Sequence, residues 1–525
     1  MTIESPAMCD WVFEHARRAP EAPAVDSPDF RLSYELLARR VAGCCDALRK
    51  LDLRPGDRVV VALPNVPASI VVSLAVQHLG AVSVEVSRDW PADQLAAVIA
   101  QTRPRAVAYA VRDEAKMKPL LEHADVWSAL RVGGATLDEA PASPSGATIA
   151  VTDAGEIRGA SEELPSVLPA RDPDAVTLLL YTSGSTGRPR AVMQTMRNIA
   201  ENARSIVAYL GLTRHDRAML ILPMSYCYGR SILQTHLLVG GSVFLDRRFM
   251  YPSVVLAAIG AERCTGFAGV PLTYELLRRH AQPDPRTMQS LRYLTQAGGA
   301  MRPETVDWAR SAFDPAKLFV MYGQTEATAR LAYLPPERAD DKRGSIGVPI
   351  SNVRLRIVDD EGNDVAQGSS GHLVANGPNV TPGYFDAPEE TATILRDGWL
   401  WTGDVAHTDE DGFYYVVGRA KEILKIGGYR VSPAQIEKVL SEHADVADVA
   451  VAGVEDALTG EASAALVVLR SGAVVTVGEL QRFCRERLAH PLVPRIFRVV
   501  EALPRSASGK VLRSEVERSL RAPAN

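Results

Sequence analysis

Helical and strand patterns alternate along the first hundred residues of the chain. The segment 34–51 carries apolar residues three and four positions apart, which predicts a helix, and 57–65 holds a short apolar run closed by Pro64. A second helical pattern spans 66–81, and a second strand pattern spans 81–86. This order is typical of parallel strands with helices on both faces of the sheet. The pattern therefore predicts an α/β fold built on parallel-type sheets flanked by helices.

The chain is too long for a single hydrophobic core. It has 525 residues, and cores stop growing near ~250–300 residues. A stretch rich in Ala, Ser, Pro and Gly at 135–172 predicts an irregular connection, and the alternation resumes at Val176. At about 345–417, strand patterns are separated by Asp-Glu-Gly-Asn and Gly-Ser-Ser-Gly turns, which predicts a β-rich part. We expect a large N-terminal domain at 1–420, which includes that part, and a small C-terminal domain at 421–525.

The C-terminal segment combines helix and strand patterns. Ser432, Pro433 and Gln435 have the spacing of a capping box with Ser432 as the N-cap of a helix. Strand, helix and strand patterns follow at 465–470, 477–488 and 495–500. About 100 residues are enough for a domain with its own core. This segment therefore predicts a small α+β domain.

Composition and charge exclude several classes of function. The formal net charge of −5 gives no reason to expect a basic surface for nucleic acid. No apolar run reaches the ~18 residues of a membrane span, and the N-terminus lacks the basic segment that begins a signal peptide. None of the six cysteines has CxxC spacing, which argues against a zinc site or a redox pair. We expect free thiols, a reducing compartment and hence a cytoplasmic protein.

The stretch YTSGSTGRPRAV at 181–192 directly follows an apolar run at 176–180. Its small residues would let backbone N–H groups converge on an anion, and its Ser and Thr hydroxyls add donors. The P-loop pattern does not fit, because Gly184 and Gly187 are too close together and no lysine follows them. From composition alone, a phosphate cradle and a solvated surface loop remain equally open.

Five further motifs follow this loop along the chain. They are AGGAM at 297–301, MYGQTE at 321–326, GWLWTGD at 398–404, GRAKEILKIGGYR at 418–430 and PRSASGK at 504–510. With the loop, they resemble the motifs of the adenylate-forming enzymes, which include acyl-CoA synthetases, nonribosomal adenylation domains and luciferases. The resemblance spans 20–515 and is closest to acyl- or aryl-CoA ligases. It implies that a carboxylate attacks the α-phosphorus of ATP, giving an acyl-adenylate and pyrophosphate.

The resemblance assigns many motif residues to the nucleotide. The loop would cradle the β- and γ-phosphates, and Tyr322 would lie against the adenine. Asp404 would accept hydrogen bonds from the ribose hydroxyls, and Arg419 would help to hold the ribose. Without the resemblance, Tyr322 would be interpreted as a core residue, Asp404 as a turn aspartate and Arg419 as a surface charge. The full set implied for ATP is Thr182, Ser183, Gly184, Ser185, Thr186, Gly187, Arg190, Gly298, Gly299, Ala300, Met321, Tyr322, Gly323, Gln324, Thr325, Asp404 and Arg419.

The resemblance also implies which residues neutralise charge. Both reactants are anions, so cations must lie between them. Glu326 and Thr186 would hold Mg²⁺ against phosphate oxygens, and Lys510 would bridge the substrate carboxylate and the α-phosphate. The alternatives are a solvated loop glutamate for Glu326 and a solvated lysine for Lys510.

In the family the small domain rotates after adenylation, so the resemblance implies that the domain at 421–525 is mobile. Lys421 matches the hinge residue of relatives. Lys425 lies on the segment that swings into the site for the second half-reaction, and we therefore count it among the catalytic residues. The alternative for both lysines is a pair of charges on a solvated helix face.

Several positions depart from the family pattern. The loop usually ends in Pro-Lys-Gly and here ends in Pro189, Arg190 and Ala191. Arginine binds phosphate well, so we expect Arg190 to contact phosphate with an altered loop geometry. The other departures are Met196 in place of histidine, Tyr226 at the gate position, and His372 in place of glutamate, to which no role is assigned.

The residues after the gate position bear on which acid is activated. Amino-acid adenylation domains place an aspartate there for the α-ammonium group, whereas this chain has Cys227. A buried ammonium group without an anionic partner is costly. We therefore expect an aromatic, aliphatic or polycyclic carboxylic acid without an α-amino group. The residues expected to form its pocket are Tyr226, Cys227, Tyr228, Gly269 and Gln296.

Coenzyme A is the expected acceptor of the acyl group. Gly427 and Gly428 resemble those of CoA ligases, and the insertion typical of fatty acyl-AMP ligases is not apparent at 350–420. A stand-alone adenylase that loads a carrier protein is the alternative. A non-catalytic nucleotide sensor is a further one, which the retained Glu326 and Lys510 disfavour. The expected ligands are thus ATP, Mg²⁺, a carboxylic acid and coenzyme A, and a monomer or a homodimer is expected.

Overall fold

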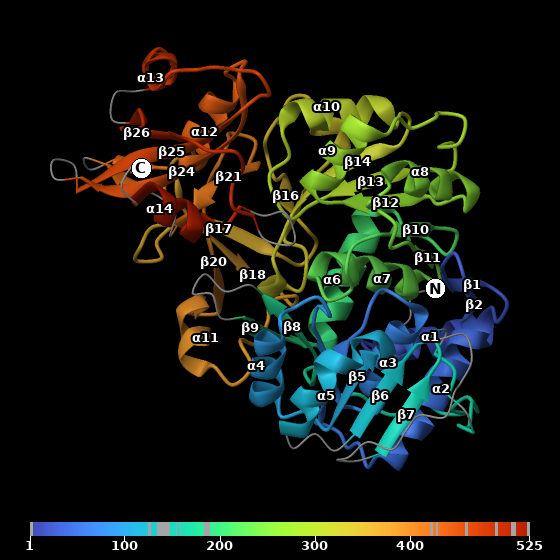
Figure 1. Ribbon diagram of the computed structural model, residues 1–525. Coiled ribbons are helices and arrows are strands. Elements are labelled where there is room, and N and C mark those ends of the chain that lie inside the picture. The colour runs from blue at the N-terminus through green and yellow to red at the C-terminus, as the bar shows by residue number, and fades with distance from the viewer. Residues whose placement is uncertain are drawn as a thin grey trace. The chain divides into compact units, whose positions relative to one another are not determined.

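The polypeptide forms two compact units. The first comprises Met1–Leu355 and Ala375–Leu400, and the second comprises Arg356–Val374 and Trp401–Asn525. The computed structural model (Figure 1) describes residues 4–123, 128–133, 147–153, 155–157, 159–182, 189–420, 424–426, 429–456, 460–488, 492–505 and 511–521.

A seven-stranded sheet lies in the first unit. Its strands, in spatial order, are β7 (Ala147–Val151), β6 (Ser128–Val132), β5 (Ala106–Ala110), β3 (Arg58–Ala62), β4 (Val82–Glu85), β8 (Val176–Thr182) and β9 (Arg190–Thr195). Neighbouring strands are parallel except for β8 and β9, which are antiparallel. Thr182 pairs with Arg190 in that ladder. The 183–189 connection, which carries most of the predicted phosphate loop, therefore starts and ends at two paired residues.

A nine-stranded sheet lies in the same unit. Its order is β16 (Val348–Pro349), β15 (Ala332–Leu334), β14 (Lys317–Tyr322), β13 (Tyr293–Gln296), β12 (Gly266–Gly269), β10 (Arg217–Leu220), β11 (Ser242–Leu245), β1 (Pro23–Asp26) and β2 (Arg31–Ser33). The run from β14 to β1 is parallel, and β15, β16 and β2 are antiparallel additions. The carboxyl ends of β12, β13 and β14 therefore meet at one edge of the sheet.

Helices connect and cover these strands. They are α1 (Met8–Arg18), α2 (Tyr34–Lys50), α3 (Pro67–His78), α4 (Ala92–Thr102), α5 (Glu114–His123), α6 (Met196–Leu210), α7 (Cys227–Val239), α8 (Pro252–Ala261), α9 (Pro271–His280), α10 (Pro303–Ala312) and α11 (Pro388–Ile394). Short 3₁₀ helices are η1 (Val111–Asp113), η2 (Thr325–Ala327) and η3 (Pro336–Arg338).

Alternate side chains of each strand enter different hydrophobic cores, as the period of a strand requires. Val59 and Val61 of β3 pack with α1, α2, α3, α6 and α7, whereas Val60 packs with α4 and α5. In the nine-stranded sheet, Leu220 faces the first of these cores and Met219 faces α8, α9 and α10. The two sheets thus share a middle layer of helices and each has a further helical layer (Figure 1).

A smaller sheet lies in the region where a β-rich part was predicted. Its path is β17 (Arg354–Val358), β18 (Gly371–Asn376), β20 (Trp399–Thr408) and β19 (Leu395–Arg396), with β21 (Tyr414–Arg419) paired to β20. The turns at 360–363 and 368–371 separate β17 from β18 as expected.

The C-terminal elements form a small α+β fold. They are β22 (Leu424–Ile426), β23 (Tyr429–Val431), α12 (Pro433–Ser441), β24 (Val446–Asp456), β25 (Gly460–Leu469), α13 (Val477–Arg485), β26 (Ile496–Val499) and α14 (Arg513–Arg521). The sheet β24–β25–β26 packs against α12 and α13 on one face and α14 on the other. The predicted fold class, α/β with a large N-terminal and a small α+β C-terminal part, is confirmed.

Two local predictions are wrong. The stretch 135–172 contains the edge strand β7, whose β-branched Ile149 and Val151 pair in register with β6; the surrounding Ala, Ser, Pro and Gly residues obscured this short pattern. The capping box is absent, because the Ser432 hydroxyl donates to the carbonyl of Val417 at 2.6 Å instead of accepting from the helix. A tertiary hydrogen bond has replaced the local one.

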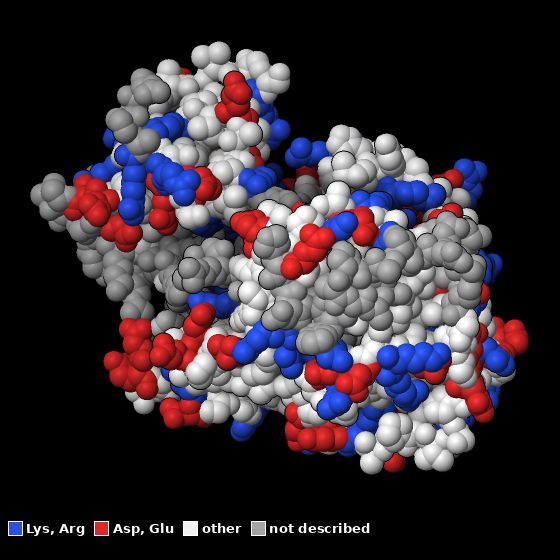
Figure 2. Space-filling view, turned by 60° about the horizontal axis from the view of Figure 1, so that its bottom comes forward, with Lys and Arg blue, Asp and Glu red and all other residues white. Residues whose placement is uncertain are grey.

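The surface and the thiols agree with the composition. On the face shown in Figure 2, lysine and arginine side chains are mixed with aspartate and glutamate and do not gather into one basic area. All six cysteines are free and buried. Among the described residues, no helix is both long enough and apolar enough to cross a membrane.

Candidate active site

Several residues predicted for the nucleotide and the acid lie at the carboxyl ends of neighbouring parallel strands. Gly269 ends β12, Gln296 ends β13, and Tyr322 ends β14 after Met321. Gly269 pairs with Gln296 across β12 and β13. Ligands of open parallel sheets bind at such strand ends, so the fold brings these residues to the edge where a ligand site is expected.

Two predicted glycines are required by close packing. Gly298 has a φ of +87°, and a Cβ there would lie 2.5 Å from the Tyr226 hydroxyl oxygen. A Cβ on Gly323 would lie 1.9 Å from the Ala329 carbonyl oxygen. Gly299 is different, because a Cβ there would meet only Pro271, at 3.5 Å. Gly298 and Gly323 therefore shape the loops after β13 and β14.

The turn 325–330, which begins with Thr325 and carries Glu326, is held from two sides. Gln194 on β9 donates to the carbonyls of Thr325 and Thr328, and Asn379 donates to those of Ala327 and Arg330. The backbone N–H of Thr381 donates to the Glu326 carbonyl at 2.9 Å. The backbone that carries the predicted metal ligand is thus fixed by β9 and by the segment 379–381.

Tyr384 links two predicted phosphate-site residues. Its hydroxyl donates to Glu326 Oε1 at 2.8 Å, and the Arg190 guanidinium carbon lies 5.4 Å from the centre of its ring. Burial, and then the nearby Glu326 carboxylate, raise the pKa of Tyr384 above its usual value, so the phenol stays protonated and can donate. Arg190 also forms an ion pair with Glu390.

This arrangement suits a hard cation. Glu326 offers a carboxylate whose orientation is set by one hydrogen bond, and carboxylate oxygen is the donor that Mg²⁺ prefers. Tyr384 and Glu390 were missed at the sequence level. The stretch TPGYF at 381–385 carried a signal, because a tyrosine follows a Pro-Gly turn there. It pairs with β9, where the Phe385 N–H donates to the Ala191 carbonyl at 2.8 Å.

The predicted acid-pocket residues at the start of α7 are uncharged; Cys227 and Tyr228 are buried, and Tyr226 is half-buried. Tyr226 is the N-cap residue of α7, and the thiol of Cys227 accepts a hydrogen bond from the Thr325 hydroxyl at 3.3 Å. Burial raises the pKa of Cys227 to about 11. The Tyr228 hydroxyl shares a 2.8 Å hydrogen bond with the Thr295 hydroxyl. An anionic partner for an ammonium group is therefore absent from these three positions.

A cavity of ≈ 20 Å³ lies beside the predicted pocket. Only Tyr228 among the predicted pocket residues lines it, together with the predicted nucleotide residue Met321. The sequence did not single out the remaining lining residues: Ile206, Leu210, Ala218, Ser231, Ile232, Thr235, His236, Gly266, Phe267, Ala268, Tyr293, Thr295 and Arg330. The volume is about that needed for a water-sized group.

Asp404 and Arg419, predicted for the ribose, are partners in the ladder of β20 and β21. Arg419 Nε lies 3.0 Å from Asp404 Oδ1, and Arg419 also donates to the Thr402 carbonyl. Asp404 is 4% exposed, whereas the Arg419 side chain is 45% exposed. Both residues belong to the second compact unit.

Several predicted residues lie outside the described part of the chain. They are Ser183, Gly184, Ser185, Thr186, Gly187, Lys421, Gly427, Gly428 and Lys510. Lys425 lies on β22, where it pairs with Arg430 of β23. His372, to which no role was assigned, contacts Asp360 Oδ1 through Nε2 at 2.8 Å.

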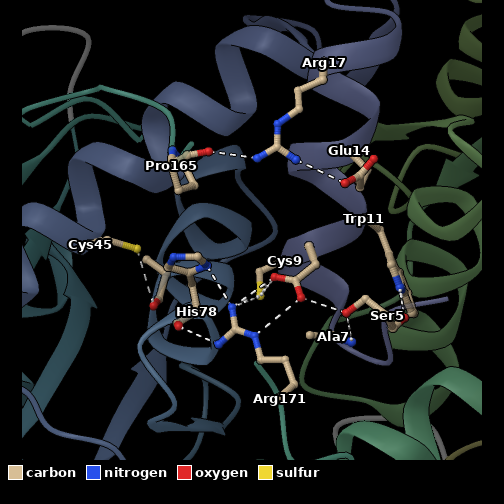
Figure 3. Close-up of polar contacts among 12 residues, drawn as sticks. Ser5, Ala7, Cys9, Trp11, Glu14, Arg17, Cys45, His78, Pro165 and Arg171 are labelled. Atoms are coloured by element: carbon tan, nitrogen blue, oxygen red, sulfur yellow. Dashed lines mark hydrogen bonds and ion pairs between the residues drawn. The ribbon is translucent and has the colours of Figure 1, made fainter. Parts of the chain in front are cut away.

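A second cluster of potential metal ligands is a structural network. The ligand atoms of Cys9, Asp10 and His78 lie within 4.8 Å of one another. Figure 3 shows the Arg171 guanidinium between them, with Nη2 3.0 Å from Asp10 Oδ1 and 3.0 Å from His78 Nδ1. The arginine cation contacts the same groups that a metal ion would need, so we assign no metal to this cluster.

Comparison with known proteins gives a consistent picture. The AMP-binding enzyme family model matches residues 12–385, and the model of the AMP-binding enzyme C-terminal domain matches residues 435–510. A feruloyl-CoA synthase from Amycolatopsis sp is 36% identical over 511 residues, covering 97% of this chain and 98% of the relative. A 2-succinylbenzoate–CoA ligase from Geobacillus sp. (strain WCH70) is 29% identical, covering 97% of this chain and 96% of the relative.

Solved structures of an o-succinylbenzoate CoA synthetase from Bacillus subtilis are similar over the same length. The complex with its acyl-adenylate intermediate has a TM-score of 0.83 and 27% identity, covering 98% of each chain. The complex with ATP and magnesium ion has a TM-score of 0.83 and 27% identity, covering 96% of this chain and 98% of the other.

Proposed function

The chain belongs to the AMP-binding enzyme family, which confirms the resemblance to adenylate-forming enzymes, and on this premise we propose that it is an acid–CoA ligase. A carboxylate oxygen attacks the α-phosphorus of ATP, and the bond to pyrophosphate breaks. The thiol sulfur of coenzyme A then attacks the acyl carbon, loses its proton, and AMP leaves. The family match over both parts of the chain is the observation that carries this proposal.

Arg190 and the 182–187 loop would bind the β- and γ-phosphates during adenylation. Arginine presents a planar set of donors that matches phosphate oxygens. The proposal is supported by the pairing of Arg190 with Thr182 at the base of the loop. Lys510 would neutralise the substrate carboxylate and the α-phosphate together, because two anions must approach each other in this step.

Glu326, with Thr186, would hold Mg²⁺. The support is a carboxylate oriented by Tyr384 and carried on a turn fixed by β9. When bound, the ion would offset negative charge on the phosphate oxygens. Tyr384 would keep the Glu326 carboxylate pointed at one position before any ligand arrives.

Tyr322, Gly298–Ala300 and Gly323–Thr325 would border the adenine at the strand ends. Asp404 would accept from the ribose hydroxyls, and Arg419 would both help to hold the ribose and position that carboxylate. The 3.0 Å ion pair supports a fixed orientation for Asp404.

The second half-reaction would use a different set of residues. We infer that the domain at 421–525 turns about Lys421 and brings the segment of Lys425 to the acyl-adenylate. A separate hydrophobic core between the β24–β25–β26 sheet and its helices supports a domain that moves as one body.

The substrate would be a carboxylic acid without an α-amino group. Cys227 is buried and neutral, so it cannot pair with an ammonium group. Burial has the larger effect and raises the pKa of Cys227, and the nearby Arg330 lowers it. The positive charge of Arg330 would repel an ammonium group.

One experiment separates the candidate functions. Acid-dependent exchange of pyrophosphate into ATP, screened over carboxylic acids and amino acids, should appear with non-amino acids only. Product analysis should then show a thioester with coenzyme A. Thioester formation only on a carrier protein would favour the stand-alone adenylase, and ATP binding without exchange for any acid would favour a nucleotide sensor.

A further inference from the structure

Arg330 is a buried cation that forms no ion pair with any described residue. Its side chain is about 2% exposed, and its Nε is buried without a hydrogen-bond partner. Its neighbours are aromatic, and the guanidinium carbon lies 5.2 Å from the centre of the Tyr228 ring. The Tyr209 phenol is also close: burial raises the pKa of Tyr209, and Arg330 lowers it by a smaller amount. A cation–π contact offsets only part of the cost of burying a charge.

Two other arginines of the same unit, with side chains that are 1% and 8% exposed, each have a carboxylate partner. Arg230, which is 1% exposed, lies 3.1 Å from Glu85 Oε1 through Nη1. Arg171 Nη2 lies 3.0 Å from Asp10 Oδ1. The described part of the chain supplies no such anion to Arg330, so this charge is compensated from elsewhere.

Arg330 lines the cavity described above, and the other polar side chains of that lining have hydrogen-bond partners. The Tyr228 hydroxyl bonds to Thr295, and the Tyr293 hydroxyl donates to Nε2 of His236, whose Nδ1–H donates to a backbone carbonyl. Burial lowers the pKa of His236 to about 4, so it is neutral at pH 7. Among the described residues that line the cavity, Arg330 is charged and has no carboxylate partner.

The cavity lies below the strand ends that border the proposed reaction site. Thr295 precedes Gln296, and Met321 precedes Tyr322, along the strands whose ends border that site. Lining residues lie one to three positions before the strand ends, which places the cavity roughly 3–10 Å below them. An acid whose carboxyl reacts at the strand ends would point its far end at Arg330.

We propose that Arg330 binds a second carboxylate at the end of the substrate remote from the carboxyl that is adenylated. A guanidinium pairs with a carboxylate through two parallel hydrogen bonds, and Arg330 lines the cavity. This inference rests on the proposed function and adds the chemical class of the substrate, a dicarboxylic acid.

Matched pairs of acids test the inference. The probes are unbranched α,ω-dicarboxylic acids of about four to ten carbons, a span chosen from strand geometry, and 4-carboxycinnamic acid, each beside its monomethyl ester. For the best pair, kcat/KM for pyrophosphate release should favour the diacid by at least ~10-fold. Arg330→Met should remove that preference and leave the ester within ~3-fold of wild type. Arg330→Lys should keep part of the preference.

Three results would overturn the inference while leaving the ligase proposal intact. They are equal or better use of the ester in every pair, equal loss of both substrates in Arg330→Met, and a preference for 4-hydroxycinnamic acid over all diacids. The last would mean that Arg330 recognises a neutral acceptor.

A readout independent of turnover separates this inference from failure of the proposed function. Since Arg330 is an unpaired buried charge, Arg330→Met should raise the melting temperature, whereas Arg230→Met should lower it by leaving Glu85 unpaired. The preferred diacid should stabilise the wild type and not Arg330→Met. A lower melting temperature for Arg330→Met, with no stabilisation of the wild type by any diacid, would reject the anion site whether or not the protein adenylates acids.

Discussion

Arg190 has one charged and one aromatic neighbour, so its role toward ATP can be separated from its local packing. It pairs with Glu390 and stacks on Tyr384. If Arg190 binds pyrophosphate oxygens, Arg190→Ala should raise the KM for ATP by about 10-fold, because a charge-assisted hydrogen bond is lost. The KM for the acid should change less. Steady-state kinetics with each substrate varied checks this.

Glu390→Gln is the matched control for Arg190. It removes the same ion pair from the other side and leaves the guanidinium in place. The KM for ATP should then stay near the wild-type value. If both variants raise the KM for ATP equally, the ion pair between Arg190 and Glu390 is what matters, and Arg190 does not contact the nucleotide.

Tyr384 should tune the response to magnesium. Tyr384→Phe removes the hydrogen bond to Glu326 Oε1, so the carboxylate loses its fixed orientation. The Mg²⁺ concentration at half-maximal pyrophosphate release should rise by about 3- to 10-fold. Tyr34→Phe is the control, because it also removes a buried hydroxyl hydrogen bond, to Gly241, far along the chain from the site. An unchanged Mg²⁺ dependence in Tyr384→Phe would exclude Tyr384 as the residue that orients Glu326.

At this scale the motifs predicted positions but not partners. Glu326 could be predicted as a site residue because it lies in a motif. The hydrogen bond from Tyr384 to Glu326 forms only because the 379–385 segment pairs with β9 in the folded chain. Arg330 could not be singled out, because an arginine in a sequence gives no sign that every nearby carboxylate is out of reach. The absence of a partner is a property of the tertiary structure.

At the level of elements, α7 carries a histidine that makes stability depend on pH. Burial lowers the folded-state pKa of His236 to about 4, from the ordinary histidine value of 6.5. Because the unfolded chain binds a proton more tightly, stability is full above pH 6.5 and falls as the pH drops toward 4, by up to roughly 3 kcal/mol. Urea unfolding of the large unit at several pH values measures this slope. His78, whose pKa burial and then Arg171 lower to about 4, adds to it.

His236→Gln should make that slope shallower, since it removes a titrating group while keeping hydrogen-bonding atoms. His280→Gln, at the exposed end of α9, is the matched control for the loss of a histidine. A wild-type slope in His236→Gln would show that His236 is not protonated on unfolding in this range.

Elements with a strong pattern were predicted well and weak ones were not. The segments 34–51 and 66–81 became α2 and α3 because their apolar spacing matches the helical period. Strand β7 was missed, because its five residues lie in a Pro- and Gly-rich stretch and show no strand pattern of their own. They form a strand by pairing with β6. Ser432 kept its place as N-cap residue, but its hydroxyl found a partner on β21 instead of the helix.

At the scale of the whole molecule, two lysines should divide the two half-reactions. If Lys510 offsets charge that develops only as phosphate transfers, Lys510→Ala should slow adenylate formation by at least ~10²-fold. It should still convert a supplied acyl-adenylate to thioester. Lys425→Ala should release pyrophosphate normally in a single turnover and form thioester slowly. Rapid-quench measurement of both steps checks this, and equal slowing of both steps in both variants would contradict a domain rotation between them.

The central claim is that a carboxylate oxygen of the substrate attacks the α-phosphorus of ATP. The most direct test uses the best acid labelled with ¹⁸O in its carboxyl group, with ATP, Mg²⁺ and coenzyme A, followed by mass spectrometry of the products. The expected products are AMP that carries one ¹⁸O atom, unlabelled pyrophosphate, and a thioester that retains the other ¹⁸O. Unlabelled AMP, or ¹⁸O in inorganic phosphate alongside ADP, would contradict it.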